Sequence, residues 1–255
     1  MKKNSVLEHL SNLFDKNKID LDPFPHIYME NVFPKKYYEE VQNNLPKKEK
    51  YIAINKTGRV DKNYSPDRYI FDLLVEDNVN QLENINQIFW KELIEILTSK
   101  ILFNKVLNTF KEIIKDRINN FSILEKNQLG NEPFNFSLKT SLIKDFTNYS
   151  LGVHTDNVEK LITFLFYIPK DNKLSDFGTS LYKSKNREHM ENDKHLSEEE
   201  TSLYFEKIKT CNFLPNSLLV FPRTNISYHG VEKINIYKKE RNLLLLNYYI
   251  SKKDK

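Results

Sequence analysis

The chain has 255 residues, and its 39 basic side chains barely exceed its 35 acidic ones, which gives a formal net charge of +4. These charges are spread along the sequence without a dense basic run, so the composition gives no support for binding to nucleic acid. Hydrophobic residues make up 39% of the chain but never form a run of about 18, so we expect a globular core and no contact with a membrane.

The single cysteine, Cys211, excludes an intramolecular disulfide and fits a reducing compartment, so we expect a cytoplasmic protein. The first residues lack the apolar run of a signal peptide. A chain of this length can form one large β-sandwich domain with helical additions or two small domains, and we favour one. The sequence does not indicate an oligomeric state.

Apolar residues at helical spacing predict a short amphipathic helix over residues 5–14. The stretch 23–30 is typical of a short strand, and Pro34 then favours a helix through about residue 41. We expect His9 to be a solvated helix residue and His26 to be structural.

Residues 47–70 are polar and irregular, and we predict a loop region with strand character only at 51–54. From Val79 to about Arg117 the apolar residues recur at helical spacing, which predicts two helices with a break near 98–100. These helices would bury one face, including Trp90, against a sheet.

The second half of the chain changes character after a turn signal at residues 130–133. From there, β-branched and aromatic residues come in short runs broken by Gly, Pro, Asn and Asp. Many short strands favour a sandwich or jelly roll, and nothing repeats at the period of a solenoid. The predicted class is therefore α+β and β-rich. The predicted strands are 134–138, 141–146, 152–156, 161–168, 179–182, 217–221 and 242–250.

His154 and Asp156 stand two residues apart in one of these predicted strands. In an extended chain the alternation of side chains points both toward the same side, and His229 offers a third ligand far downstream. Two His and one carboxylate on one face of a metal, with the other positions open, is the arrangement of non-haem Fe(II) oxygenases. Taken alone, a His-x-Asp triplet is more often a surface pair or a hydrogen-bonded turn. The prediction therefore depends on the ordered set of His-x-Asp, intervening strands, a lone His-Gly and Arg241.

In this order of motifs the sequence resembles the 2-oxoglutarate and Fe(II)-dependent dioxygenases, in particular the prolyl-4-hydroxylase-like branch. The resemblance covers about residues 132–250 and, more loosely, 23–34. It implies a double-stranded β-helix, a cupin-like jelly roll, within a single oxygenase domain over residues 1–255. Residues 1–130 would form a mainly helical and irregular support region, and residues 131–250 the β-helix core.

The resemblance also implies the cofactors. His154, Asp156 and His229 would hold Fe(II), with 2-oxoglutarate as co-substrate, O2 as oxidant and ascorbate as an accessory reductant.

Co-substrate residues follow from the strand at 161–168. Alternation puts Thr163, Leu165 and Tyr167 toward a pocket and the other side chains against helices. In the resembled family a tyrosine at this strand position hydrogen-bonds the distal carboxylate of 2-oxoglutarate, which makes Tyr167 the match and Thr163 its neighbour. Otherwise Tyr167 is an ordinary core aromatic with its hydroxyl satisfied elsewhere.

Arg241 follows His229 by twelve residues, a little more than is common in the family. A buried Arg beside a hydrophobic strand is costly without an anion. The distal carboxylate of 2-oxoglutarate would supply one through two parallel hydrogen bonds. The alternative is that Arg241 caps the preceding turn.

Residues 183–209 are dense in charge and poor in apolar periodicity, which is typical of a solvated insertion. In the resembled family an insertion at this place overhangs the mouth of the site, so we expect a lid. His189 and His195 lack ligand partners at fixed spacing and are expected at the surface.

Five residues are candidate contacts for the primary substrate. Gly178 and Thr179 match a Gly-containing strand of the family, where a small residue leaves room for the substrate. Arg59 and Tyr64 lie in the region that reaches the mouth of the site, although solvation at the surface is the more ordinary role there. Arg223 completes the set.

The sequence thus predicts a hydroxylase that converts 2-oxoglutarate to succinate while it oxidises an unidentified substrate. A prolyl or other amino-acid residue, a free amino acid and a small metabolite or sugar are all open, as is desaturation in place of hydroxylation. The alternative is a non-catalytic jelly-roll module that binds metal or sugar. A cupin enzyme with a fuller His set would need a fourth ligand, and the sequence offers none.

Overall fold

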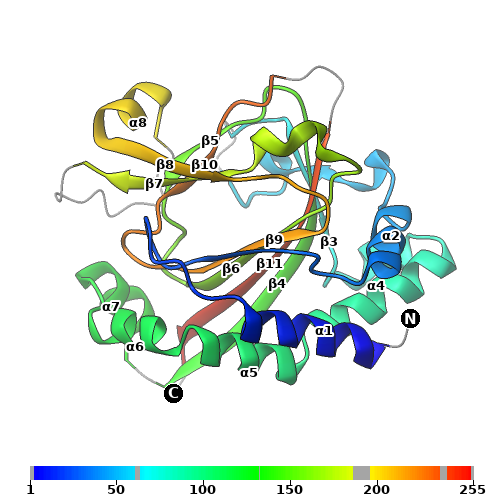
Figure 1. Ribbon diagram of the computed structural model, residues 1–255, viewed down its shortest axis with the longest axis horizontal. Helices are drawn as coiled ribbons and strands as arrows, with labels where there is room; N and C mark the ends of the chain where they lie inside the picture. The colour runs from blue at the N-terminus through cyan, green and yellow to red at the C-terminus, as the bar shows by residue number, and fades with distance from the viewer. Residues whose placement is uncertain (1–2, 61–63, 132, 186–195, 236–239, 254–255) are drawn as a thin grey trace.

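The computed structural model describes residues 3–60, 64–131, 133–185, 196–235 and 240–253. Within these residues the strands form two antiparallel sheets that face each other in Figure 1. The larger sheet has the order β1 (Ile27–Glu30), β9 (Ser217–Pro222), β6 (Lys160–Tyr167), β11 (Arg241–Lys252), β4 (Phe134–Asp145), β3 (Arg68–Asp72) and β2 (Ile52–Ala53). The smaller sheet has the order β5 (Leu151–His154), β10 (His229–Val231), β7 (Thr179–Ser184) and β8 (Phe205–Cys211).

From β4 onward the chain passes back and forth between the two sheets. Strands β4, β6, β9 and β11 lie in the larger sheet, and β5, β7, β8 and β10 in the smaller one. As a result β11 lies between β4 and β6, and β5 pairs with β10 from far along the chain. This is the topology of a double-stranded β-helix, so the predicted fold class is confirmed.

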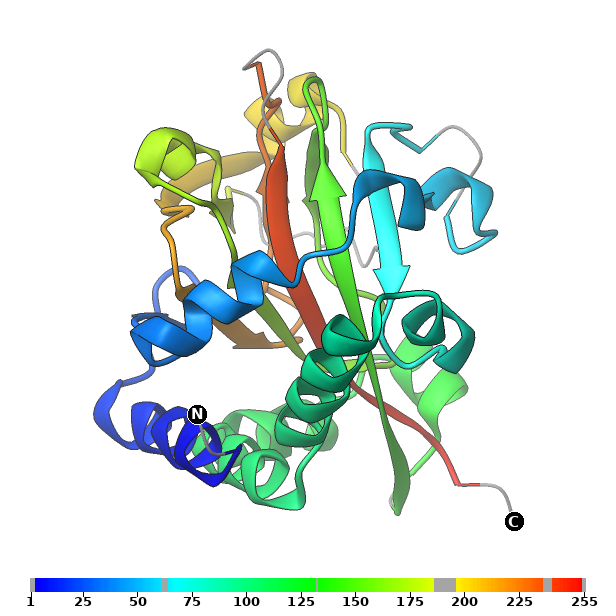
Figure 2. The ribbon, with the colours of Figure 1, turned by 90° about the vertical axis from the view of Figure 1, so that its right-hand side faces the viewer.

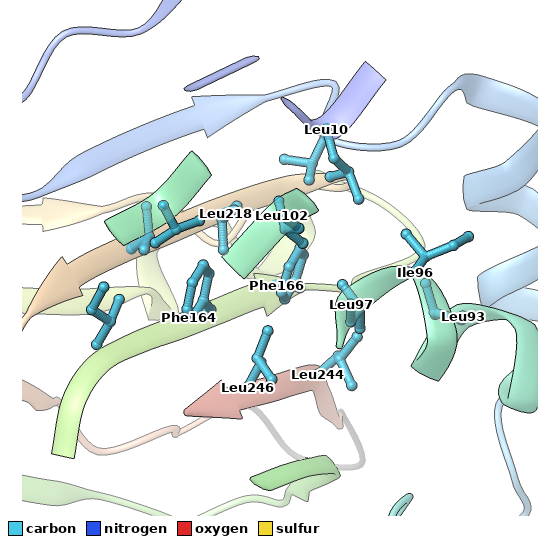
Figure 3. Packing of buried hydrophobic residues seen from close by; sticks show 14 of the residues in the cluster. Leu10, Leu93, Ile96, Leu97, Leu102, Phe164, Phe166, Leu218, Leu244 and Leu246 are labelled. Carbon is cyan, nitrogen blue, oxygen red and sulfur yellow. The ribbon is translucent and has the colours of Figure 1, made fainter. Parts of the chain in front are cut away.

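Helices cover the face of the larger sheet that points away from the smaller sheet (Figures 1 and 2). Leu97 and Leu102 from two of these helices pack against Phe164, Phe166 and Leu244 of the sheet (Figure 3). Full burial of each such side chain stabilises the fold by about 1.5–3 kcal/mol.

None of the helices in the described ranges combines the length and the apolar character needed to span a bilayer. The helices are α1 (Lys3–Lys16), α2 (Lys35–Asn43), α3 (Glu76–Asn80), α4 (Asn84–Leu97), α5 (Lys100–Thr109), α6 (Lys111–Asn119), α7 (Ile123–Leu129) and α8 (Glu198–Tyr204), with single 3-10 turns at η1 (Lys48–Lys50), η2 (Ile54–Lys56) and η3 (Asn172–Phe177).

The alternation predicted for β6 is confirmed. Phe164 and Phe166 belong to the cluster beneath the helices, whereas Leu165 and Tyr167 belong to a second cluster between the sheets. Thr163, on the same face as Leu165, lines a cavity between the sheets. One strand therefore separates the helix-packed core from the inner space.

Several predicted boundaries are wrong. The two helices expected between residues 79 and 117 are divided among α3, α4, α5 and α6, although the break near 98–100 is confirmed and Ser99 caps α5. Helix α7 and strand β3 were not predicted, and the strands expected at 134–138 and 141–146 form the single strand β4.

The insertion predicted over 183–209 contains regular structure where the chain is described, namely the end of β7, helix α8 and most of β8. Strand β7 runs to Ser184, and β8 pairs with it antiparallel along its length. Only the ends of β8, Phe205 and Cys211, are buried, so its sequence gives little apolar signal. His189 and His195 lie outside the described residues.

Candidate metal centre

His154 and His229 face each other across the pairing of β5 and β10. The two residues are direct partners in the antiparallel register, and their ring centroids lie 4.4 Å apart. Each Nδ1 is hydrogen-bonded to a backbone carbonyl two residues earlier, that of Gly152 at 2.8 Å and that of Ser227 at 2.9 Å. This fixes the tautomer in which Nδ1 carries the proton and Nε2 carries the lone pair that a metal binds.

Asp156 joins the two imidazoles from just beyond the strand. We predicted that the strand would run through Asp156, but β5 ends at His154. Even so, ligand atoms of His154, Asp156 and His229 lie within 4.8 Å of one another, and all three residues are buried. The convergence therefore comes from the turn after β5 and not from the alternation of a strand.

The charge states of the three residues suit a divalent cation. Burial lowers the pKa of His229, although the nearby Asp156 carboxylate opposes this, so the imidazole is neutral at pH 7. Burial opposes ionisation of Asp156, but Lys160 and the two imidazoles outweigh it and hold the pKa of this carboxyl well below its usual range. Lys160 Nζ donates to one carboxylate oxygen at 2.5 Å, and Thr163 Oγ1 to the other at 2.6 Å.

A buried ionic cluster holds the turn that follows Asp156. The carboxylate of Glu125 in α7 accepts hydrogen bonds from Arg117 at 2.9 Å and from Arg223 at 2.6 Å. Arg117 in turn donates to the backbone carbonyls of Val158 and Lys160, and Arg223 Nε to that of Asp156. We call Arg117, Glu125 and Arg223 the turn clamp.

The three ligand residues line a cavity of about 320 Å³ between the sheets. Its floor comes from alternate residues of β11 and β6 and from Ile143 of β4, and its wall from β5, β10 and the region before β3. None of the described residues from 183 to 209 lines it. The residues that line the cavity are Ile54, Arg59, Val60, Tyr64, Arg68, Ile143, Leu151, His154, Thr155, Asp156, Asn157, Lys160, Thr163, Leu165, Thr179, His229, Val231, Arg241, Leu243 and Leu245.

Arg241 lines this cavity and is 1% exposed. Its Nε donates to the carbonyl of Phe177 at 2.8 Å and its Nη1 to Asp145 at 2.7 Å, whereas its Nη2 donates to none of the described residues. Arg68 also binds Asp145, through Nε at 2.6 Å and Nη2 at 2.9 Å. The chain thus supplies part of the anionic partner that we expected from a ligand alone, and two guanidinium groups share one carboxylate.

Tyr167 and Thr163 lie differently from the expectation that both contact the co-substrate. Tyr167 does not line the cavity: its hydroxyl donates to Thr179 Oγ1 at 2.8 Å, and its ring packs beside the Arg241 guanidinium. Thr163 lines the cavity at Asp156, with its hydroxyl also 3.1 Å from Asn247 Oδ1. The cavity-lining hydroxyl close to Tyr167 is that of Thr179.

Of the five candidate substrate contacts, Arg59, Tyr64 and Thr179 line the cavity. Gly178 does not: a Cβ there would lie 1.6 Å from the carbonyl oxygen of Cys211, so Gly178 is small because β8 packs against it and not to leave room for a substrate. Arg223 does not line the cavity either, because its guanidinium is engaged in the turn clamp.

Sequence reasoning missed Lys160, Asp145 and the turn clamp. Lys160 stands four residues after Asp156, a spacing that predicts an ion pair on a helix. It predicts nothing here, because these residues form a turn. Asp145 ends an apolar strand and reads as a boundary residue. The clamp joins Arg117 and Glu125, which lie eight positions apart in two different helices, to Arg223, which lies 98 positions beyond Glu125, and no local pattern links these residues.

No family model matches the chain, and no curated protein sequence does. Among solved structures, the chain is similar to the non-heme alpha ketoglutarate dependent epimerase SnoN from nogalamycin biosynthesis, with a TM-score of 0.50 and 9% identity over 96% of this chain and 81% of that one. A prolyl hydroxylase from Trichoplax adhaerens gives a TM-score of 0.48 and 15% identity over 97% of this chain and 90% of that one. A prolyl-4-hydroxylase from Pseudomonas putida gives a TM-score of 0.48 and 10% identity over 95% of this chain and 98% of that one. The topology of the two sheets and the likeness to SnoN together show that this chain has a double-stranded β-helix fold, which it shares with SnoN.

Proposed function

We propose that this chain is an Fe(II)- and 2-oxoglutarate-dependent dioxygenase that hydroxylates its substrate, a prolyl or other amino-acid residue or a small metabolite. Residues 1–255 would act as a single oxygenase domain, working in the cytoplasm. The observation that carries the proposal is the convergence of His154, Asp156 and His229 within 4.8 Å on a cavity that also contains Arg241.

The three ligand residues fit Fe(II) by their chemistry. Two imidazoles and one ionised carboxylate, all buried, make up the donor set of a facial triad, which leaves coordination positions for other ligands. When bound, iron with 2-oxoglutarate and O2 would supply the oxidising chemistry, in which 2-oxoglutarate is converted to succinate and CO2, one atom of O2 enters succinate and the other enters the substrate; ascorbate would keep the iron reduced.

Arg241 is suited to the distal carboxylate of 2-oxoglutarate. Asp145 neutralises only one of the two guanidinium groups that it binds, so Arg68 and Arg241 together retain one positive charge. The Nη2 group of Arg241 is available to donate, and the hydroxyl of Thr179 lines the same cavity. A carboxylate bound there would be held by charge-assisted hydrogen bonds to a buried guanidinium group, and such bonds are stronger in a buried site than in water.

The remaining residues that line the cavity exclude water from the co-substrate and orient Asp156. Leu243, Leu245 and Ile143 form the apolar floor, which excludes water from the carbon chain of the co-substrate. Lys160 and Thr163 keep Asp156 ionised and fix its two oxygens. These residues would bind the co-substrate and hold Asp156 in position. The proposed chemistry requires no further acid or base from the described residues of the cavity.

Succinate formation tests the proposal. Protein loaded with Fe(II) should bind 2-oxoglutarate without O2, giving the charge-transfer absorption of the complex, and should release succinate when O2 and a substrate are supplied. A screen of amino acids, peptides and small metabolites, with mass spectrometry for an added oxygen atom, would identify the substrate. A non-catalytic module that binds metal or sugar would give neither the charge-transfer band nor succinate, and that result would overturn the proposal.

A further inference from the structure

The cavity is lined by more positive than negative side chains. Four cations line it in the part of the chain that the structure describes, namely Arg59, Arg68, Lys160 and Arg241, but only one carboxylate, Asp156. Two further carboxylates lie directly behind the lining. Asp72 pairs with Arg59, and Asp145 is shared by Arg68 and Arg241. The four cations thus face three carboxylates, which leaves one positive charge in the site.

The proposed cofactors do not remove this excess. Fe(II) carries two positive charges and 2-oxoglutarate two negative ones, so together they are neutral. A site with one metal, one aspartate, one arginine and 2-oxoglutarate would be balanced. Here the pairs Arg59–Asp72 and Arg68–Asp145 are each neutral, and Arg241 would bind the distal carboxylate of 2-oxoglutarate. Lys160 pairs with Asp156, which it would have to share with the metal, so the unbalanced positive charge falls on Lys160.

The excess charge is located beside the metal ligands. In this structure Lys160 Nζ shares the carboxylate of Asp156, the same group that would coordinate the metal. A carboxylate that donates a lone pair to a dication has less charge to offer an ammonium group. The side chain of Lys160 is only 19% exposed, and a poorly solvated ammonium without a full partner is costly. An anionic ligand in the cavity would offset that cost.

We propose that the primary substrate carries a carboxylate or phosphate group and that the ammonium of Lys160 binds it. The inference rests on the proposed function and specifies its substrate class. It favours free amino acids, other organic acids and phosphate esters over neutral sugars and over prolyl residues inside a neutral peptide. Thr155 and Asn157, which line the cavity next to Asp156, would add neutral hydrogen-bonding groups around the same anion.

Nuclear relaxation by a bound paramagnetic metal tests this without turnover or a known substrate. The protein is loaded with Mn²⁺ and 2-oxoglutarate, and the relaxation of the methyl protons of acetate is compared with that of acetamide, its neutral isostere. Wild type should bind acetate about ten-fold more tightly than acetamide, a difference of ~1.4 kcal/mol. Methyl phosphate in place of acetate distinguishes the two anionic groups, because the group that fits better binds more tightly.

Three variants assign the effect to Lys160. Lys160→Gln should remove the preference for acetate and Lys160→Arg should keep most of it. Lys173→Gln, which removes a lysine that is 71% exposed, should change nothing. Equal binding of acetate and acetamide by wild type, or a preference that persists in Lys160→Gln, would overturn the inference. The wild-type comparison decides the matter even if Lys160→Gln fails to hold the metal. Failure of wild type to bind Mn²⁺ and 2-oxoglutarate at all would instead contradict the proposed function.

Discussion

At the scale of single residues, the site is made of groups whose charge is set by their neighbours. Asp156 is ionised because Lys160 and Thr163 occupy its two oxygens, and His229 is neutral because it is buried. A lone buried carboxylate would otherwise take up a proton, since desolvation disfavours its charge. The three ligand residues are therefore prepared for a cation in their ordinary state at pH 7.

Each of the three ligand residues should be needed for the metal. We expect His154→Ala, Asp156→Ala and His229→Ala each to weaken the binding of Fe(II) or Mn²⁺, measured by calorimetry, and to abolish succinate formation, because each removes a donor atom. His9→Ala, which changes a half-buried imidazole in α1 that binds the carbonyl of Asn31, serves as the control and should leave both unchanged. Wild-type metal affinity in any of the three ligand variants would remove that residue from the centre.

Arg241 should act on the co-substrate and not on the metal. Arg241→Ala should weaken 2-oxoglutarate by about 2–5 kcal/mol, the range for loss of one partner of a buried charge pair, and Arg241→Lys should recover part of the loss. The fold should persist, because Arg68 still pairs with Asp145. Tyr167→Phe should weaken 2-oxoglutarate by about 0.5–1.5 kcal/mol, because it removes the hydrogen bond that orients Thr179. An anaerobic titration that follows the charge-transfer band measures all four proteins, and equal affinity in wild type and Arg241→Ala would contradict the assignment.

At the scale of elements, the strands and helices were more predictable from the sequence than the residues that surround and hold the metal-binding side chains. The 2-residue period of β6 and the helical period of α4 and α5 are local signals, and both led to correct elements. Strand β8 was missed because its interior is charged or polar, and it is held by its pairing with β7. His154, Asp156 and His229 were found because their order along the chain, followed by Arg241, matches the motifs of the resembled family. The groups around them, such as Asp145 and Glu125, come from elements that meet only in the folded chain.

The turn clamp links α6 and α7 to the turn that follows Asp156, and its carboxylate gives a prediction about pH. Burial opposes ionisation of Glu125, but the backbone N–H of Ser122 and the two guanidinium groups outweigh it and lower the pKa of Glu125. Because the pKa of Glu125 is lower in the folded state than in the unfolded state, its ionised carboxylate stabilises the fold at every pH above the unfolded-state pKa of about 4.3. This contribution is lost progressively as the pH falls below that value.

Glu125→Gln should therefore cost about 3–5 kcal/mol of stability at pH 7, because it leaves two buried guanidinium groups without their anion. The difference from wild type should begin to shrink as the pH falls through the unfolded value of about 4.3, and it should continue to shrink until the folded wild-type carboxylate, whose pKa is lower, is also protonated. Urea unfolding at each pH measures this, with Glu198→Gln on α8 as a control whose stability should follow that of wild type. A difference that does not depend on pH would contradict an ionised role for Glu125.

At the scale of the whole molecule, stability and chemistry lie on opposite faces of one sheet. Leu97 of α4 packs with Leu244 on the outer face (Figure 3), whereas the neighbouring residues Leu243 and Leu245 line the cavity on the inner face. Leu97→Ala should destabilise the protein by about 2–5 kcal/mol, the range for truncating a buried Leu. It should leave the affinity for metal and 2-oxoglutarate unchanged at temperatures where the variant is folded, because the sheet separates the two layers.

Ile88→Ala on the same helix removes a side chain that is 68% exposed, so the stability of this control variant should stay within about 0.5 kcal/mol of wild type. Chemical unfolding and metal titration of both variants test the separation. A loss of metal affinity in folded Leu97→Ala would mean that the helical layer, beyond stabilising the sheet, also sets the geometry of the site through it.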